Sequence, residues 1–110
     1  MNSIAITFPN QDPDDELVYE LTLDGPNGLI ERIAPLTITG CAWDILPIGD
    51  DQVPLQIHSH SEAPDFSSLR VRLGEGSLGN RYIVRAGLTL SDGQRMHVAF
   101  YVSIDYTSYL

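Results

Sequence analysis

Two histidines separated by one residue are the best candidates for metal chemistry in this sequence. His58 and His60 would share a face of an extended strand, and Glu62 or Asp65 follows closely. Imidazoles and carboxylates are zinc ligands, but a zinc site needs three or four ligands that converge. The spacing fixes no third ligand, and the serines and proline between these residues are typical of a loop tip. We therefore expect no metal and no other cofactor.

Three further patterns contain residue types found in functional motifs but lack the necessary context. Residues 74–79 match GxGxxG, yet that dinucleotide motif must open a helix, and a strand-like run follows here. Ser61, His60 and Asp65 could be assembled into a hydrolytic triad, but nothing positions a base against a nucleophile. The acidic groups at 12–16 and 50–51 lack the spacing of an EF-hand. We predict no catalytic residue and a non-enzymatic protein.

The charge balance disfavours nucleic acid as a partner. The formal charge is −9 and there is no lysine, so a surface that binds phosphates would require arginines such as Arg70, Arg72 and Arg85 to cluster on one face. We interpret these three arginines as solvated positions on strand faces. The single Cys41 excludes an intrachain disulfide, and its strand-like neighbours predict a buried free thiol.

Neither a membrane span nor a signal peptide is indicated. No apolar stretch approaches the length that crosses a bilayer, and no basic start precedes an apolar run. We therefore expect synthesis and folding in a cytoplasm and no membrane partner.

The elements that would carry these residues are strands. Residues 80–104 predict a hairpin in which apolar residues alternate on both arms. The alternation is in register only with a three-residue loop at 91–93, which pairs Leu88 with Met96 and Val84 with Phe100. Gly93 would supply the left-handed residue of that loop. The outward set of the same hairpin then opposes Ile83 and Tyr101 as an exposed apolar pair.

The remaining segments favour an all-β, immunoglobulin-like antiparallel sandwich of about seven strands in one domain (1–110). Strand patterns occur at residues 3–8, 17–23, 36–46, 53–57 and 69–73, with one helical turn possible at 29–34. Gly40 is the expected position of a bulge between Ile38 and Trp43. Tyr82 would form a tyrosine corner, and Trp43 would lie in the facing sheet. We expect an N-terminal arm (1–16) and a C-terminal tail (105–110).

Three segments resemble the phage fiber-tail adaptors, a family of small bacteriophage tail proteins. The first is residues 8–19, Phe-Pro-Asn-Gln-Asp-Pro-Asp-Asp-Glu-Leu-Val-Tyr. The others are the strand at 36–43, which ends in Trp43, and the hairpin with its Ser-Asp-Gly turn. The resemblance implies a structural virion protein of the tail, present in several copies around the tail axis. Its partners would be the tail tube or connector and the fibre or spike proteins.

A partner interface is the expected functional site. Aromatic residues suit interfaces because one end is apolar while the other can stay wet. Termini can also extend as arms between subunits. The predicted interface residues are Phe8, Pro9, Asp12, Pro13, Ile83, Tyr101, Tyr106 and Tyr109. A capsid decoration protein or a carbohydrate-binding surface module is the alternative function.

Overall fold

The computed structural model describes residues 3–7 (backbone), 11–49 and 52–106 of the 110-residue chain. Strands account for most of these residues, with one short helix. The elements are β1 (Ser3–Thr7), β2 (Glu16–Thr22), α1 (Leu29–Ile33), β3 (Ile38–Ile48), β4 (Leu55–Glu62), β5 (Ser68–Glu75), β6 (Arg81–Leu90) and β7 (Arg95–Ser103). α1 is the helical turn that the sequence allowed at 29–34.

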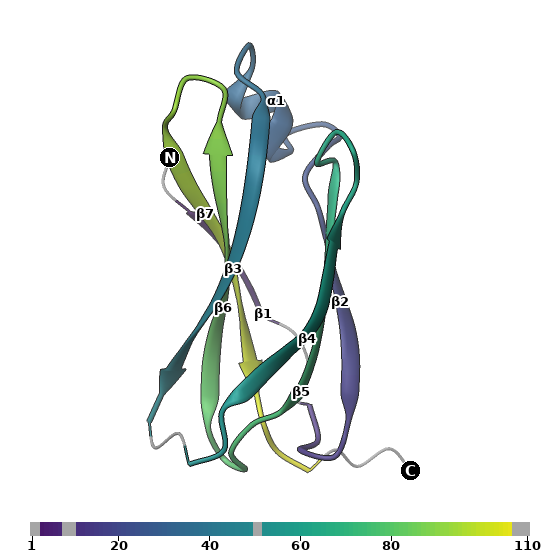
Figure 1. Cartoon of the computed structure of the whole chain (residues 1–110), viewed down its shortest axis with the longest axis vertical. Coiled ribbons are helices and arrows are strands. Elements are labelled where there is room, and N and C mark those ends of the chain that lie inside the picture. Colours follow the sequence, from purple (N-terminus) through teal and green to yellow (C-terminus); the bar gives the residue numbers. More distant parts are fainter. Residues whose placement is uncertain (1–2, 8–10, 50–51, 107–110) are drawn as a thin grey trace.

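The strands form two sheets packed face to face, as predicted for an all-β sandwich. One sheet has the order β1-β7-β6-β3, and the other has the order β2-β5-β4. Figure 1 shows the four-stranded sheet on the left and the three-stranded sheet on the right, with α1 at one end. Counting strands along the chain, β2-β5-β4 opposite β7-β6-β3 is the strand order of an immunoglobulin-like sandwich.

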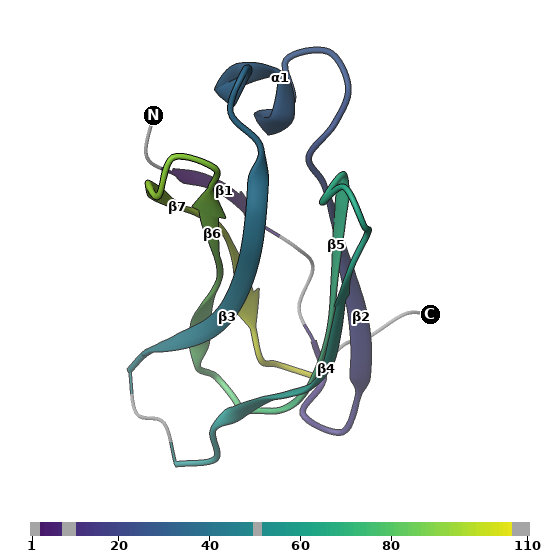
Figure 2. The ribbon, with the colours of Figure 1, turned by 45° about the horizontal axis from the view of Figure 1, so that its top comes forward.

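β1 pairs with β7 in parallel. Residues 3–7 run beside residues 97–101 of β7, so this part of the expected N-terminal arm belongs to the four-stranded sheet. The two layers are visible in Figure 2, where β2, β4 and β5 lie apart from β3, β6 and β7.

The β6–β7 hairpin has the predicted register. Leu88 pairs with Met96 and Val84 with Phe100. The loop at 91–93 is closed by Gly93 N–H donating to the Leu90 carbonyl at 2.9 Å, and Gly93 has φ of 90°. The inward residues of both arms are buried because they meet the other sheet.

The bulge in β3 lies at Gly40, as the sequence predicts. The register against β6 shifts between Ile38 and Gly40, which lets Ile38 and Trp43 both face inward. The expectation that Trp43 belongs to the sheet facing Tyr82 is wrong. β3 pairs directly with β6, so both aromatic residues belong to the four-stranded sheet.

β4 differs from the expectation that the polar run after Ile57 breaks the strand. The strand continues to Glu62, with a register shift between Ile57 and Ser59. β4 is an edge strand, so polar side chains can reach water while the backbone still pairs with β5. Val53, expected as an inward residue, precedes β4 and is 50% exposed.

Tyr82 forms the predicted tyrosine corner. Its side chain is fully buried, and its hydroxyl accepts from Ser77 N–H at 2.9 Å. The same hydroxyl donates to the Val53 carbonyl at 3.2 Å. The corner therefore ties the β5–β6 connection to the segment that enters β4.

Gln11 is a buried polar residue that the sequence did not single out. Its side-chain amide donates to the Leu73 and Asp15 carbonyls at 3.0 and 3.1 Å, and its oxygen accepts from the Tyr19 hydroxyl at 2.6 Å. Burial, together with the Asp15 charge, raises the pKa of Tyr19 to about 12, so its hydroxyl keeps the proton that it donates. The Gln11 backbone also bonds to Ser103, so one residue links the two sheets.

A candidate docking surface on the four-stranded sheet

The outer face of the four-stranded sheet is the best candidate for a functional surface. We define it by the outward positions of β3, β6 and β7, since side chains alternate along each strand and register brings these positions together. They are Gly40, Ala42, Asp44, Leu46 and Ile48 of β3, Arg81, Ile83, Arg85, Gly87 and Thr89 of β6, and Arg95, His97, Ala99, Tyr101 and Ser103 of β7.

An apolar strip occupies one half of the outer face. Leu46 pairs with Ile83, and Ile83 pairs with Tyr101, so the three side chains lie side by side across three strands. Leu46 and Ile48 are 41% and 42% exposed, and the predicted pair of Ile83 and Tyr101 is half-buried. The apolar strip is therefore Leu46, Ile48, Ile83 and Tyr101.

An ion pair marks the centre of the outer face. The Arg85 guanidinium binds the Asp44 carboxylate through two hydrogen bonds, of 2.9 and 2.5 Å. These hydrogen bonds are the main reason why the pKa of Asp44 is lowered, so the carboxylate stays charged. At the end of the strip, the Arg81 guanidinium lies 5.3 Å from the centre of the Tyr101 ring, which is cation–π geometry.

A depression occupies the other half of the outer face. It has a volume of about 420 Å³ and is open to solvent. Gly87 and Ala42 pair across β6 and β3 and form the floor of the depression, because neither carries a long side chain that would fill it. Asp44, Arg95 and His97 line it as well. A Cβ atom on Gly87 would lie 3.3 Å from His97 Nε2, so the imidazole covers part of this floor.

The arginines that the sequence grouped together do not form one patch. Arg70 and Arg72 lie on β5 in the three-stranded sheet, where they pair with Glu20 at 2.5 Å and with Glu16 at 3.7 Å. Arg85 lies on the other sheet with Asp44. The interpretation as solvated strand positions is confirmed for Arg70 and Arg72, which are exposed, whereas Arg85 is half-buried.

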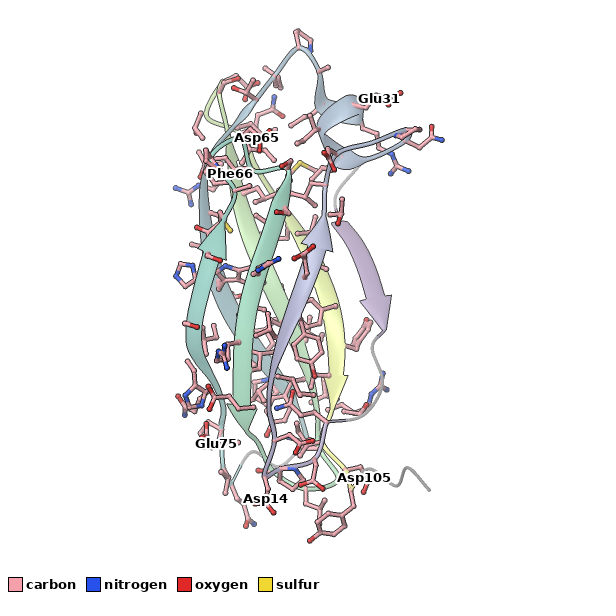
Figure 3. All side chains as sticks on the ribbon, turned by 90° about the vertical axis from the view of Figure 1, so that its right-hand side faces the viewer. Asp14, Glu31, Asp65, Phe66, Glu75 and Asp105 are labelled. Atoms are coloured by element: carbon pink, nitrogen blue, oxygen red, sulfur yellow. The ribbon has the colours of Figure 1, made fainter. Side chains whose placement is uncertain are left out.

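The predicted interface residues fall in two places. Ile83 and Tyr101 are neighbours on the outer face. Asp12, Pro13 and Tyr106 belong to one end of the sandwich, where the Asp105 N–H donates to the Gln11 carbonyl at 2.9 Å. Asp14 and Asp105 mark this end in Figure 3. Phe8, Pro9 and Tyr109 lie outside the described residues.

Sequence reasoning missed Leu46, Ile48 and Arg95 as surface residues, whereas it placed Gly87 opposite His97 on the outward side of the hairpin, as the structure does. The signal for the first two was the bulge at Gly40, because one extra residue reverses the parity of everything that follows it. Leu46 and Ile48 face outward together with Asp44, whereas Trp43 and Ile45 pack against the core.

The two histidines of β4 bind separate carboxylates. His58 Nε2 lies 2.8 Å from Glu75 Oε2, and His60 Nδ1 lies 2.7 Å from Glu62 Oε2. The bulge beside Ile57 breaks the alternation that would have put both imidazoles on one face. Within the part of the chain that the structure describes, no group of three or more histidine, cysteine or acidic side chains could hold a metal ion.

Cys41 is a half-buried free thiol on β3. Burial, reinforced by the negative charge of Glu62, raises its pKa to about 11. A thiol reacts as the thiolate, so this environment suppresses nucleophilic chemistry near neutral pH.

Within the described ranges, no helix is both long and apolar enough to traverse a lipid bilayer. The comparisons with known proteins gave no match to any family model, any curated protein or any solved structure.

Proposed function

We propose that this chain is a non-enzymatic structural protein of a bacteriophage tail. It would join the tail tube or connector to fibres or spikes by contacts between protein surfaces. The observation that carries the docking role is the apolar strip of Leu46, Ile48, Ile83 and Tyr101 on the outer face of the four-stranded sheet. Contiguous exposed apolar area on a small protein is typical of a surface that binds another protein.

The assignment to a phage tail is supported by the sequence resemblance in residues 8–19 and 36–43 and in the hairpin. The sandwich fold fits it, because such a domain presents sheet faces and loops while its core remains rigid. Fold alone does not specify function, so the location and the partners require direct tests.

The first test is the location of the protein. Mass spectrometry and antibody labelling of purified virions should find it at the tail, and purified protein should bind tail or fibre proteins. Absence from virions together with no binding to these proteins would refute the proposal. Labelling of the capsid, or binding to glycans, would favour the alternative of a decoration or carbohydrate-binding module.

The second test concerns the surface. Ile83→Lys places a charge in the apolar strip and should weaken binding to the tail partner at least about tenfold, since the loss of a hot-spot residue costs about 2 kcal/mol or more and about 1.4 kcal/mol is tenfold. Val18→Lys is the matched control. Val18 is 50% exposed on β2 of the other sheet, so the same substitution there should leave binding unchanged. Equal loss in both variants would exclude the apolar strip as the interface.

A further inference from the structure

We propose that the outer face also binds the acidic end of a second copy of this chain, so that copies associate face to end. We define the acidic end as Asp12, Asp14, Asp105 and Tyr106. The inference rests on the proposed function only in taking the outer face as a docking surface. The occupant follows from the distribution of charge and shape over the molecule.

The outer face is positive on a strongly acidic protein. It carries Arg81, Arg85 and Arg95 against the single carboxylate of Asp44, whereas the whole chain has a formal charge of −9. Arg95 is exposed, and no ion pair to it occurs among the residues that the structure describes. The outer face of the other sheet is balanced, because Arg70 and Arg72 pair with glutamates.

The acidic end carries three carboxylates and an exposed aromatic residue at the same end of the sandwich. Asp12 Oδ1 accepts from the Asp14 N–H at 2.9 Å, which folds this turn back on itself. The Asp105 N–H donates to the carbonyl of Gln11, which directly precedes this turn. Figure 3 shows Asp14 and Asp105 at the same end of the sandwich. Tyr106 follows directly and is 66% exposed.

The two surfaces are complementary in shape as well as in charge. The depression at Gly87 has a volume of about 420 Å³, which accommodates an aromatic ring. Arg95, His97 and Asp44 line it, and the Asp44 carboxylate is already paired with Arg85. An aromatic side chain flanked by carboxylates meets both requirements, since the ring fills the depression while the carboxylates meet the arginines. Tyr106 beside Asp105 provides this combination.

Charge also argues against the alternative in which two outer faces meet around a twofold axis. That arrangement brings the arginines of one copy toward those of the other, and opposed like charges are unfavourable. A face-to-end contact uses two different surfaces on each copy. Each copy can then bind two others, which generates a ring or an open chain.

Sedimentation of the purified protein tests this inference at an ionic strength of about 0.15 M, where repulsion between distant charges is screened over about 8 Å. We expect the average mass to rise with protein concentration. Arg95→Glu on the face and Tyr106→Ala at the end should each raise the dissociation constant at least about tenfold, a loss of about 1.4 kcal/mol. A wild-type protein that stays monomeric at every concentration would overturn the inference.

Mixing the two variants gives the decisive result. The Arg95→Glu copy retains an intact end and the Tyr106→Ala copy an intact face, so the mixture should form one-to-one dimers that neither variant forms alone. A mixture that associates no better than its components would exclude a face-to-end contact. Circular dichroism and thermal unfolding establish that both variants are folded.

Arg72→Glu is the matched control, because it makes the same charge change on the other sheet, where Arg72 pairs loosely with Glu16. Association should match the wild type, and an equal loss would attribute the effect to net charge and overturn the inference. The outcome is separable from the proposed function. A monomeric protein whose binding to tail proteins is still lost in Ile83→Lys removes the inference and leaves the proposed function standing.

Discussion

At the scale of single residues, Gln11 is the side chain whose loss should cost most for its size. It is fully buried, and its amide satisfies two backbone carbonyls and the Tyr19 hydroxyl. Gln11→Leu keeps a similar volume but removes these partners, and each buried polar group left unpaired costs about 1–3 kcal/mol. We expect the free energy of unfolding, measured in urea, to fall by at least about 2 kcal/mol.

Gln56→Leu is the control for this substitution, because Gln56 is exposed on β4 and should change stability little. Tyr19→Phe completes a double-mutant cycle. It should destabilise the wild type but cost less in the Gln11→Leu background, where the hydroxyl has already lost its Gln11 acceptor. Strictly additive effects would contradict the network described here.

The thiol of Cys41 makes a second prediction at this scale. Since its pKa is raised to about 11, mainly by burial, only a small fraction is thiolate at about pH 8. Its reaction with a disulfide reagent should therefore be slow in the folded protein and accelerate as pH rises toward 11. In guanidinium chloride the rate should become that of an ordinary cysteine.

Glu62→Gln supplies a test of the second cause of this shift. Removing the Glu62 charge should lower the pKa of Cys41 and raise the rate at fixed pH, although burial still keeps the rate below that of the unfolded chain. A folded-state rate equal to the unfolded-state rate would show that the thiol is not shielded.

At the scale of elements, local pattern was most informative where two strands are joined by a short turn. The alternation in the β6–β7 hairpin, together with Gly93, determined the register because only one loop length matches both apolar sets. β4 was misread because its pairing with β5 is set by long-range contacts, and an edge strand tolerates a polar sequence.

The candidate docking surface was only half predictable for a related reason. Ile83 and Tyr101 followed from the hairpin alone, whereas Leu46 and Ile48 join them only through the pairing of β3 with β6. Gln11 was not predictable, because its partners come from β2, β5 and β7, and no local pattern marks a glutamine that will be buried.

Two glycines in these elements should respond to alanine in opposite ways. Gly93 has φ of 90°, so Gly93→Ala should destabilise the protein by about 1 kcal/mol or more. Gly40 lies at the β3 bulge with ordinary φ, and the nearest atoms to an added Cβ would be 3.9 Å away on Thr89. Gly40→Ala should be neutral or stabilise by up to about 1 kcal/mol, because alanine loses less backbone entropy on folding.

Chemical denaturation of both variants measures this difference directly. Gly93→Ala as stable as the wild type would mean that the turn can adopt another geometry, and the hairpin register would then need re-examination by NMR. A large loss in Gly40→Ala would show that the bulge depends on glycine.

At the scale of the whole molecule, charge is distributed unevenly, and this distribution should make the free energy of unfolding depend on salt concentration. The two ends carry carboxylates, such as Asp14 and Asp105 at one end and Glu31 and Asp65 at the other (Figure 3), while the outer face of the three-stranded sheet is neutral through its ion pairs. Repulsion between like charges at the ends weakens the folded state, and salt screens it. Raising the salt concentration from low to moderate values should therefore increase the free energy of unfolding of the wild type at neutral pH.

Asp14→Asn removes one repelling charge and should reduce this salt dependence, with a change in stability within about 0.5 kcal/mol. Glu20→Gln removes the same charge but breaks the pair with Arg70, so it should give no gain at low salt. Urea unfolding of the three proteins at two salt concentrations makes the comparison, and equal responses of Asp14→Asn and Glu20→Gln would show that net charge, rather than its placement, controls stability.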